Sequence, residues 1–163
     1  GVETLNRPEE IARDSTTSDE VILHTIKHYK DFDNIILLQP TSPLRDSSDI
    51  DKAYRIFKEK NANALISVTQ IDNKILKSFI AKEDGSLQGI HNNTYPFMPR
   101  QSLPQTYQSN GAIYIVKRDL FIENPSFLPQ NTHYYLMSEE HSIDIDTLAD
   151  LEYANKIMQN KTL

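Results

Sequence analysis

Cysteine is absent from the 163-residue sequence, and glycine is scarce. Without cysteine the protein has neither a disulfide framework nor a thiolate zinc site, and this composition favours an intracellular setting. The four glycines stand at positions 1, 85, 89 and 111 and form no cluster that could cradle phosphates. Neither a P-loop motif nor a nucleophile elbow occurs. The 163-residue sequence therefore contains no glycine-rich nucleotide-binding loop.

Long apolar runs and clustered positive charges are lacking as well. The longest apolar runs are far shorter than the roughly 20 residues that a membrane span requires, and the first residues show no export signal. The net charge is −6 and the lysines and arginines are scattered, which argues against nucleic acid as a partner. With 38% hydrophobic and 25% charged residues, the sequence predicts one soluble domain over residues 1–163, located in the cytoplasm.

Hydrophobic periodicity predicts an α/β fold. The three predicted helices span residues 18–30, 47–60 and 146–158. The three predicted strands span residues 34–39, 64–69 and 112–116. The order strand, helix, strand over residues 34–69 predicts a right-handed crossover in a parallel sheet. In the last helix, the residues predicted to face inward are Leu148, Leu151, Ala154 and Ile157.

The middle of the chain, approximately residues 72–105, has a different character. Two short apolar segments flank a turn at residues 83–86, and three prolines then interrupt regular structure. We predict an insertion with a hairpin and a long loop. Tyr95, Phe97 and Met98 in that loop could supply an apolar contact with a second subunit.

Asp144 and Asp146 form the strongest candidate metal site. They stand two residues apart, so in an extended segment both carboxylates point to the same side. Mg²⁺ prefers a few carboxylate oxygens together with water and substrate phosphates. An alternative reading is that Asp146 caps the following helix and Asp144 is a solvated loop residue.

Gln39 and Arg45 bracket a loop at the end of the first predicted strand. Ligands of open parallel sheets bind at this end of the strands, and Pro40 and Pro43 stiffen the loop. A well-capped surface turn would explain the same residues.

Three cations are weaker candidates. Arg7, followed by a row of hydroxyls that ends at Ser18, could bind an anion or a ribose, although a helix cap explains the row more simply. Lys77 and Arg100 could bind a sugar carboxylate or could simply be solvated.

Four separated segments carry a resemblance to a known family. They are Arg7-Pro8 with residues 14–18, the motif LLQPTSPLR at residues 37–45, residues 100–114, and residues 142–151. Together they resemble the acylneuraminate cytidylyltransferases, or CMP-sialic acid synthetases, including the similar enzymes that activate legionaminic acid. The resemblance implies a mostly parallel, three-layer nucleotidyltransferase fold, with a small β-rich dimerisation insertion at about residues 72–105.

The resemblance also implies a reaction. CTP and a nine-carbon 2-keto acid sugar, N-acetylneuraminate or legionaminate, give the CMP-sugar and pyrophosphate, with Mg²⁺ as cofactor. By the resemblance, Asp144 and Asp146 hold the metal and are catalytic. Arg7 and Ser18 contact the nucleotide. The implied sugar-binding residues are Gln39, Lys77, Arg100, Tyr114 and Phe127.

Within that set, the resemblance implies that Arg100 binds the sugar carboxylate. It implies that Tyr114 and Phe127 line the pocket for the sugar's acyl group. Lys77 falls where a lysine of the partner subunit reaches into the site, which implies a homodimer with a shared site.

The sequence departs from the family in two places. Gln108 stands where some relatives carry a cation. The N-terminal strand and glycine-rich, lysine-containing loop of the family are absent, so we expect that about 60 residues, two βα units, are missing ahead of Gly1. The chain alone should then bind CTP poorly. Two alternatives stay open: a cytidylyltransferase for another 2-keto sugar acid, and a non-catalytic sugar-nucleotide binding or dimerisation module.

Overall fold

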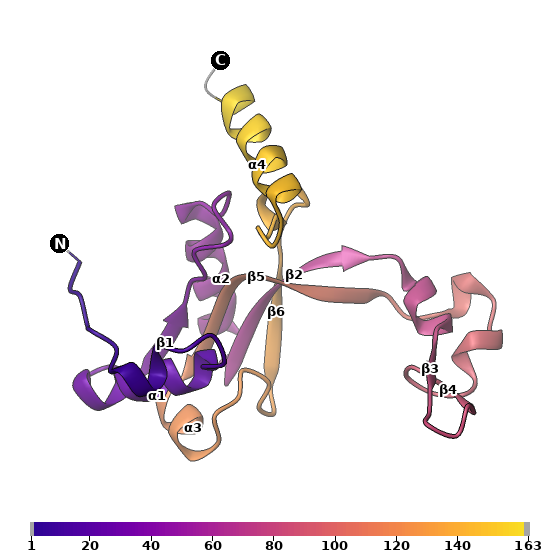
Figure 1. The fold of residues 1–163 in the computed structure, drawn as a ribbon, viewed down its shortest axis with the longest axis horizontal. Helices are drawn as coiled ribbons and strands as arrows, with labels where there is room; N and C mark the ends of the chain where they lie inside the picture. The colour runs from indigo at the N-terminus through magenta and orange to yellow at the C-terminus, as the bar shows by residue number, and fades with distance from the viewer. Residues whose placement is uncertain (1, 162–163) are drawn as a thin grey trace.

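A mixed four-stranded sheet forms the centre of the computed structural model, which describes residues 2–161 (Figure 1). Its strands lie in the order β1-β5-β2-β6. Their bounds are Asn34–Leu37 for β1, Ala64–Ile71 for β2, Thr106–Lys117 for β5 and Thr132–Leu136 for β6. β1, β2 and β6 point the same way, and β5 runs antiparallel between β1 and β2. The predicted parallel strands therefore have an opposing strand between them.

β5 is the longest strand and carries an irregularity. The sequence predicted only residues 112–116, whereas the strand begins at Thr106, just after the prolines. Its register against β2 shifts between Ile66 and Val68, opposite Gly111, whose φ is +74°. Glycine adopts this left-handed conformation without the steric cost that a Cβ brings. The shift is a β-bulge, which re-aims the chain locally.

The described residues form four α-helices. They are α1 (Ser18–His28), α2 (Ser47–Glu59), α3 (Arg118–Glu123) and α4 (Leu148–Lys161). α1 and α2 both begin with capping boxes: Thr17 with Glu20, and Asp46 with Asp49. The predicted helices are confirmed with small changes at their ends, and α3 and β6 are additions that the sequence did not predict.

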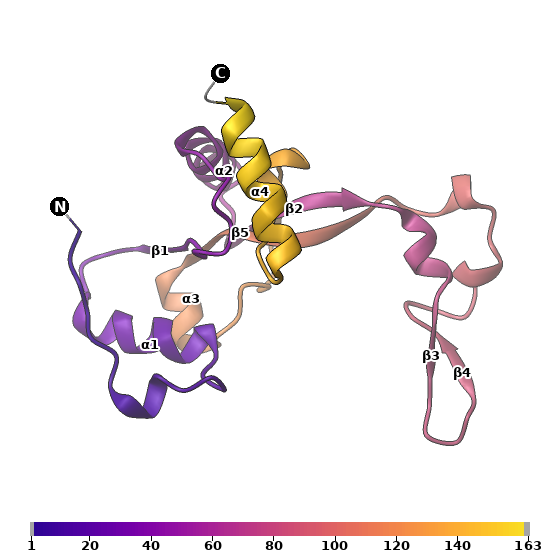
Figure 2. The ribbon, with the colours of Figure 1, turned by 45° about the horizontal axis from the view of Figure 1, so that its top comes forward.

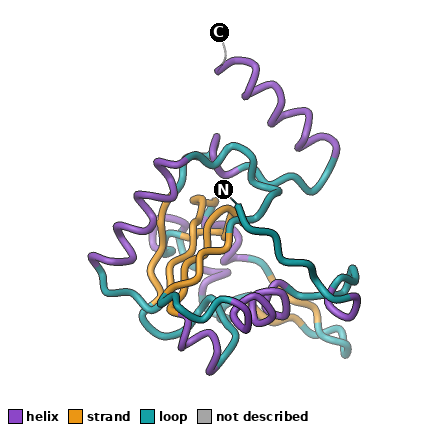
Figure 3. Tube along the Cα trace, turned by 90° about the vertical axis from the view of Figure 1, so that its left-hand side faces the viewer, coloured by secondary structure: helices purple, strands orange, loops and turns teal. Residues whose placement is uncertain are grey.

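α1 and α2 cover the two faces of the sheet. On one face of the sheet, Ile22 and Ile26 of α1 pack with Ala64, Val116 and Phe121. On the other face, α2 contributes Ala53 and Phe57 to a cluster with apolar residues of β2 and β5. Figure 3 shows the strands enclosed between helices. The predicted three-layer α/β arrangement is confirmed.

α4 projects from the body of the molecule instead of covering the sheet (Figures 1 and 2). Of the residues predicted to face inward, Ala154 is buried, but Leu148 is 80% exposed and Leu151 is also exposed. The prediction was wrong for these two leucines, because a projecting helix has little protein surface beside it to cover an apolar face.

Residues 72–105 form an extended arm on the side of the molecule opposite α1 and β1 (right in Figures 1 and 2). It holds a two-stranded antiparallel sheet, β3 (Phe79–Ala81) with β4 (Leu87–Gly89), which confirms the predicted hairpin. Its short 3-10 helices are η2 (Asn73–Lys77), η3 (Tyr95–Phe97) and η4 (Arg100–Ser102). Two further 3-10 helices, η1 (Glu9–Ile11) and η5 (Glu140–Ser142), lie outside the arm.

Within residues 2–161, no helix is long and apolar enough to cross a membrane.

Candidate active site

Gln39 and Asp144 meet above Gly111. A Cβ placed on Gly111 would lie 2.7 Å from Gln39 Oε1 and 3.1 Å from Asp144 Oδ2. Both side-chain oxygens therefore rest against a backbone position that only glycine leaves open. The loop after β1 and the aspartate segment, which are about a hundred residues apart in sequence, are thus brought together.

Three further hydrogen bonds fix the loop after β1. The Ile145 amide donates to the Thr41 carbonyl at 2.9 Å, which joins this loop directly to the aspartate segment. Arg45 Nη1 donates to the Gln39 carbonyl at 3.1 Å and to the Ala112 carbonyl at 2.7 Å. Burial lowers the pKa of Arg45, although the charge of Asp49 works in the opposite direction. Arg45 therefore holds Gln39 against β5 through main-chain atoms.

The Asp144 carboxylate is only partly satisfied. Its Oδ1 atom is buried and accepts no hydrogen bond from the described part of the chain. An unpartnered carboxylate oxygen away from water is unfavourable, and buried charges are normally paired or bound to a metal. A hard divalent cation would satisfy this oxygen, so the residues present fit a metal site at Asp144.

Asp146 does not cap α4 with its side chain. Thr147 and Asp150 do so instead: Asp150 Oδ2 accepts from the Thr147 amide at 2.8 Å, and Thr147 Oγ1 accepts from the Asp150 amide at 3.3 Å. The Thr147 hydroxyl and amide lower the pKa of Asp150. Asp146 contributes only its backbone N–H to this cap, at 3.3 Å from Asp150 Oδ2, and its carboxylate is exposed. The alternative reading of Asp146 as a cap is therefore wrong.

A second group could also hold a metal ion, and sequence reasoning missed it. Ligand atoms of Asp46, Asp49 and His141 lie within 4.8 Å of one another. Asp49 is 4% exposed and already accepts from the Tyr135 hydroxyl at 2.9 Å and from His141 Nδ1 at 2.7 Å. Burial, with help from the Asp49 carboxylate, raises the pKa of Tyr135 to about 12, so this phenol remains a donor at neutral pH. Asp144 is the more available metal ligand, because in the described part of the chain its Oδ1 accepts no such bond.

Two aromatic residues implied for the acyl group lie in contact. The ring centroids of Tyr114 and Phe127 are 5.0 Å apart, and Phe127 also packs on Phe121 at 5.2 Å. Tyr114 pairs with Leu37 across the β1–β5 ladder, so it lies beside the strand that leads to Gln39. The structure brings these rings together, and their role towards a sugar stays a prediction.

The N-terminal residues implied for nucleotide binding are exposed. Ser18 is the first residue of α1, and Arg7 precedes η1. The Thr17 hydroxyl caps α1, and the Thr16 hydroxyl accepts from the Arg13 amide at 3.2 Å. Capping therefore explains part of the hydroxyl row but not Ser18, whose role stays a prediction.

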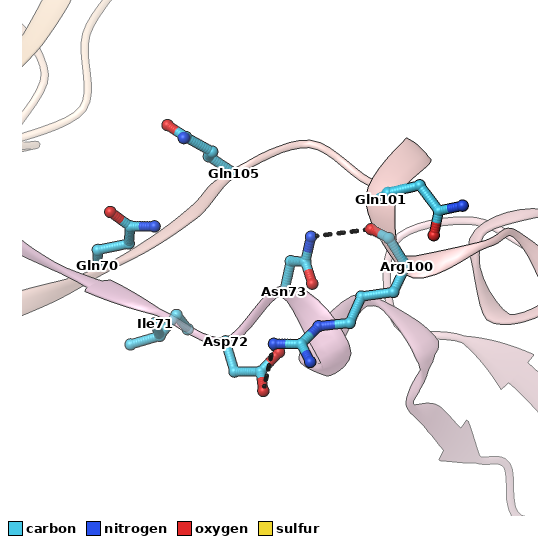
Figure 4. Close-up of a pocket in the computed structure, with 7 residues that line it drawn as sticks. All are labelled: Gln70, Ile71, Asp72, Asn73, Arg100, Gln101 and Gln105. Carbon is cyan, nitrogen blue, oxygen red and sulfur yellow. Dashed lines mark hydrogen bonds and ion pairs between the residues drawn. The ribbon is translucent and has the colours of Figure 1, made fainter.

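Arg100 and Lys77 lie on the arm, which projects away from the body that carries Gln39 and Asp144 (Figures 1 and 2). Arg100 Nη2 lies 3.2 Å from Asp72 Oδ2, and Asn73 Nδ2 donates to the Arg100 carbonyl at 3.2 Å. Asp72, Asn73 and Arg100 line a cavity of about 380 Å³ at the base of the arm (Figure 4). One chain alone therefore does not bring Arg100 or Lys77 to Asp144.

Known proteins match nearly the whole chain, although no protein-family model does. The chain is 35% identical over 162 residues to the N-acylneuraminate cytidylyltransferase of Escherichia coli O18:K1:H7, covering 99% of this chain and 38% of that protein. It is 30% identical over 166 residues to the CMP-N,N'-diacetyllegionaminic acid synthase of Legionella pneumophila, covering 94% and 67%. The chain thus spans about two fifths of the first relative's length and two thirds of the second's.

A solved structure has a similar fold. It is that of CMP:2-keto-3-deoxy-manno-octonic acid synthetase in complex with CTP, with a TM-score of 0.60 and 15% identity. The match covers 91% of this chain and 70% of that chain. At this identity the likeness concerns the fold alone, and it supports the α/β arrangement described above.

Proposed function

This chain belongs to the acylneuraminate cytidylyltransferase family, and on that premise we propose that it joins CTP to a nine-carbon 2-keto acid sugar, N-acetylneuraminate or legionaminate. The products are the CMP-sugar and pyrophosphate. The observation that carries the proposal is the buried Oδ1 of Asp144, which accepts no hydrogen bond within residues 2–161. The Oδ2 atom of the same carboxylate lies over Gly111, as does Gln39 Oε1. Since CTP is an intracellular nucleotide, we place the reaction in the cytoplasm.

Asp144 and Asp146 are the proposed ligands of Mg²⁺. Two carboxylates leave most of the coordination sphere of this ion to water and substrate phosphates, as Mg²⁺ prefers. When bound, the ion neutralises negative charge that develops on the phosphoryl oxygens and on the departing pyrophosphate. Asp144 supplies its inner oxygen, and the exposed Asp146 supplies the second carboxylate.

The remaining residues bind and orient the two substrates. Gln39, fixed through its backbone by Arg45, offers amide groups to the sugar next to the metal site. Tyr114 and Phe127 form an aromatic wall for the acyl group. For the nucleotide we propose Arg7 and Ser18. Holding the sugar hydroxyl near the α-phosphorus in this way supplies much of the catalysis, because positioning replaces a bimolecular encounter.

The full-length protein provides the direct test. Incubated with CTP, Mg²⁺ and either nine-carbon sugar, it is expected to release pyrophosphate. Eight-carbon 2-keto acids and pseudaminic acid serve as comparison substrates, and a preference for one of them would transfer the proposal to that sugar. If CTP or sugar binds but no sugar of the panel yields pyrophosphate, the protein is a non-catalytic binding module.

We also propose that two subunits share each site. Lys77 and Arg100 are implied for the sugar but project away from Asp144 on the arm, so they can act only on the site of a second copy. The arm exposes apolar side chains that a partner would cover; they are Phe79, Ile80, Leu87, Ile90 and Phe97. A homodimer joined through the arm satisfies both observations.

Mixing inactive variants tests the shared site. An equal mixture of Asp144→Asn and Arg100→Ala subunits is expected to recover about a quarter of wild-type activity, because half of randomly formed dimers are mixed and each has one complete site. The measurement is pyrophosphate release after subunit exchange. A mixture of Asp144→Asn with Gln39→Ala is the control. Each site takes Gln39 and Asp144 from the same subunit, so every site in a mixed dimer still lacks one of them. Equal activity in the two mixtures would contradict a shared site.

A further inference from the structure

We propose that Asn110 is a positioning residue that holds Asp144 over Gly111 by way of Ser142; the inference rests on the proposed metal role of Asp144. Asn110 lies on β5, directly before Gly111, and only 5% of its surface is exposed. It touches neither substrate in the proposed scheme. A buried amide needs partners for its oxygen and for both of its N–H groups, and the identity of these partners gives Asn110 its role.

The oxygen end of Asn110 fixes the bulge of β5. Asn110 Oδ1 accepts from the Ser67 hydroxyl at 2.6 Å and from the Ala112 amide at 3.2 Å. Ser67, which is fully buried on β2, also accepts from the Ile113 amide through its hydroxyl at 2.7 Å. The two amides that follow Gly111 thus find side-chain acceptors at the place where the strand register shifts. The pair of side chains therefore sets the backbone on which Gln39 and Asp144 rest.

The nitrogen end of Asn110 fixes the loop that carries Asp144. Asn110 Nδ2 donates to Ser142 Oγ at 2.9 Å and lies 3.2 Å from Met137 Sδ. Ser142 Oγ in turn donates to the Ser138 carbonyl at 2.7 Å, so its hydroxyl has one fixed orientation. Ile143 is extended, and therefore Ser142 and Asp144 point to the same side of the chain.

The side-chain amide of Asn110 thus connects the bulge of β5 with the loop that carries Asp144. Each of its hydrogen-bonding groups is engaged, and a fully satisfied buried network selects one geometry where an apolar residue of similar size would allow several. Without this connection, the Asp144 loop would keep its contacts to Thr41 and Asp49 through Ile145 and His141, but it would lose its link to the bulge. Such a change should loosen metal binding more than it alters the fold.

The test measures metal affinity in the full-length protein. Mn²⁺ is titrated by electron paramagnetic resonance, with and without CTP, because this readout does not require turnover. Asn110→Ala and Ser142→Ala are each expected to weaken Mn²⁺ binding by about tenfold and to raise the half-saturating Mg²⁺ concentration in turnover by a similar factor. The KM for the sugar should change less than about twofold. Ser142 is only half-buried, so Ser142→Ala should disturb folding less than Asn110→Ala. If Asn110→Ala does not fold, the Ser142→Ala protein provides the test.

Two further variants sharpen the result. Ser142→Thr keeps the hydroxyl and is expected to restore most of the affinity. Ser138→Ala removes an exposed hydroxyl from the same loop. This hydroxyl accepts from the His141 amide at 3.3 Å, and its removal should leave the affinity unchanged. Unchanged Mn²⁺ affinity in a folded Ser142→Ala protein would overturn the proposal, as would wild-type Mn²⁺ binding that survives Asp144→Asn. If binding depends on Asp144 and Ser142 but no pyrophosphate forms, the positioning role stands and the proposed reaction falls.

Discussion

Replacement of Asp144 by asparagine is expected to lower turnover of the full-length protein about a thousandfold and, at the same time, to raise its melting temperature in the absence of metal. The loss follows because a bound metal stabilises transition-state charge by several kcal/mol, and each ~1.4 kcal/mol is tenfold in rate. The gain follows because Asp144 Oδ1 is buried and has no hydrogen-bond partner among residues 2–161, so removal of its charge relieves a desolvation penalty.

A loss of turnover together with a higher metal-free melting temperature distinguishes a metal ligand from a structural aspartate. A structural residue loses stability when it is replaced, whereas a ligand held ready for a cation gains it. Thermal melts with and without Mg²⁺ make the measurement: the ion should stabilise the wild type, because it binds the folded state, but not Asp144→Asn. A lower melting temperature in metal-free buffer, together with normal turnover, would remove Asp144 from the site.

Asp146→Asn gives a matched comparison. It should also lose turnover, because it removes the second proposed ligand. It should leave the metal-free melting temperature nearly unchanged, since the Asp146 carboxylate is exposed and the cap of α4 uses Thr147 and Asp150 instead. Asp31→Asn, at an exposed position after α1, serves as the control for loss of one negative charge.

The sequence predicted the elements whose signals are local. Capping residues and helical periodicity located α1 and α2, and continuous apolar runs located β1 and β2. The weaker signals were missed: α3 has six residues, and β6 is an edge strand with exposed Tyr134 and Leu136. The antiparallel insertion of β5 depends on pairing across the whole sheet, which periodicity does not encode.

The candidate site divides in the same way. The spacing of Asp144 and Asp146 left a metal site and a helix cap both open, and the loop at Gln39 left a binding loop and a surface turn both open. The resemblance to the family favoured the binding roles. Neither signal indicated that these residues meet at Gly111, because that contact depends on a bulge of β5, which is far from both residues in sequence. Nothing in the sequence indicated a role for Asn110 or Ser67, because the hydrogen-bond partner of a single polar residue in an apolar strand depends on the three-dimensional structure.

Gly111→Ala is the second change with a large expected effect, and it concerns the bulge itself. Its φ of +74° makes any side chain unfavourable by about 1–2 kcal/mol. A new Cβ would in addition lie 2.7 Å from Gln39 Oε1 and 3.1 Å from Asp144 Oδ2, so both oxygens must move. A displacement of this order at a reacting centre costs roughly a hundredfold in rate. We expect kcat/KM to fall by that factor.

A second glycine allows the backbone strain to be separated from the contact with the site. Gly85 on the arm has nearly the same φ, +78°, but a Cβ there would have no neighbour within 4 Å. Gly85→Ala should therefore lower the melting temperature by roughly 2–8 °C, from a strain of about 1–2 kcal/mol, and keep its turnover. Gly111→Ala should lose at least as much stability and, unlike Gly85→Ala, should lose turnover and Mg²⁺ affinity together. Equal kinetics in the two variants would show that Gly111 serves the strand alone and that the space above it is not part of the site.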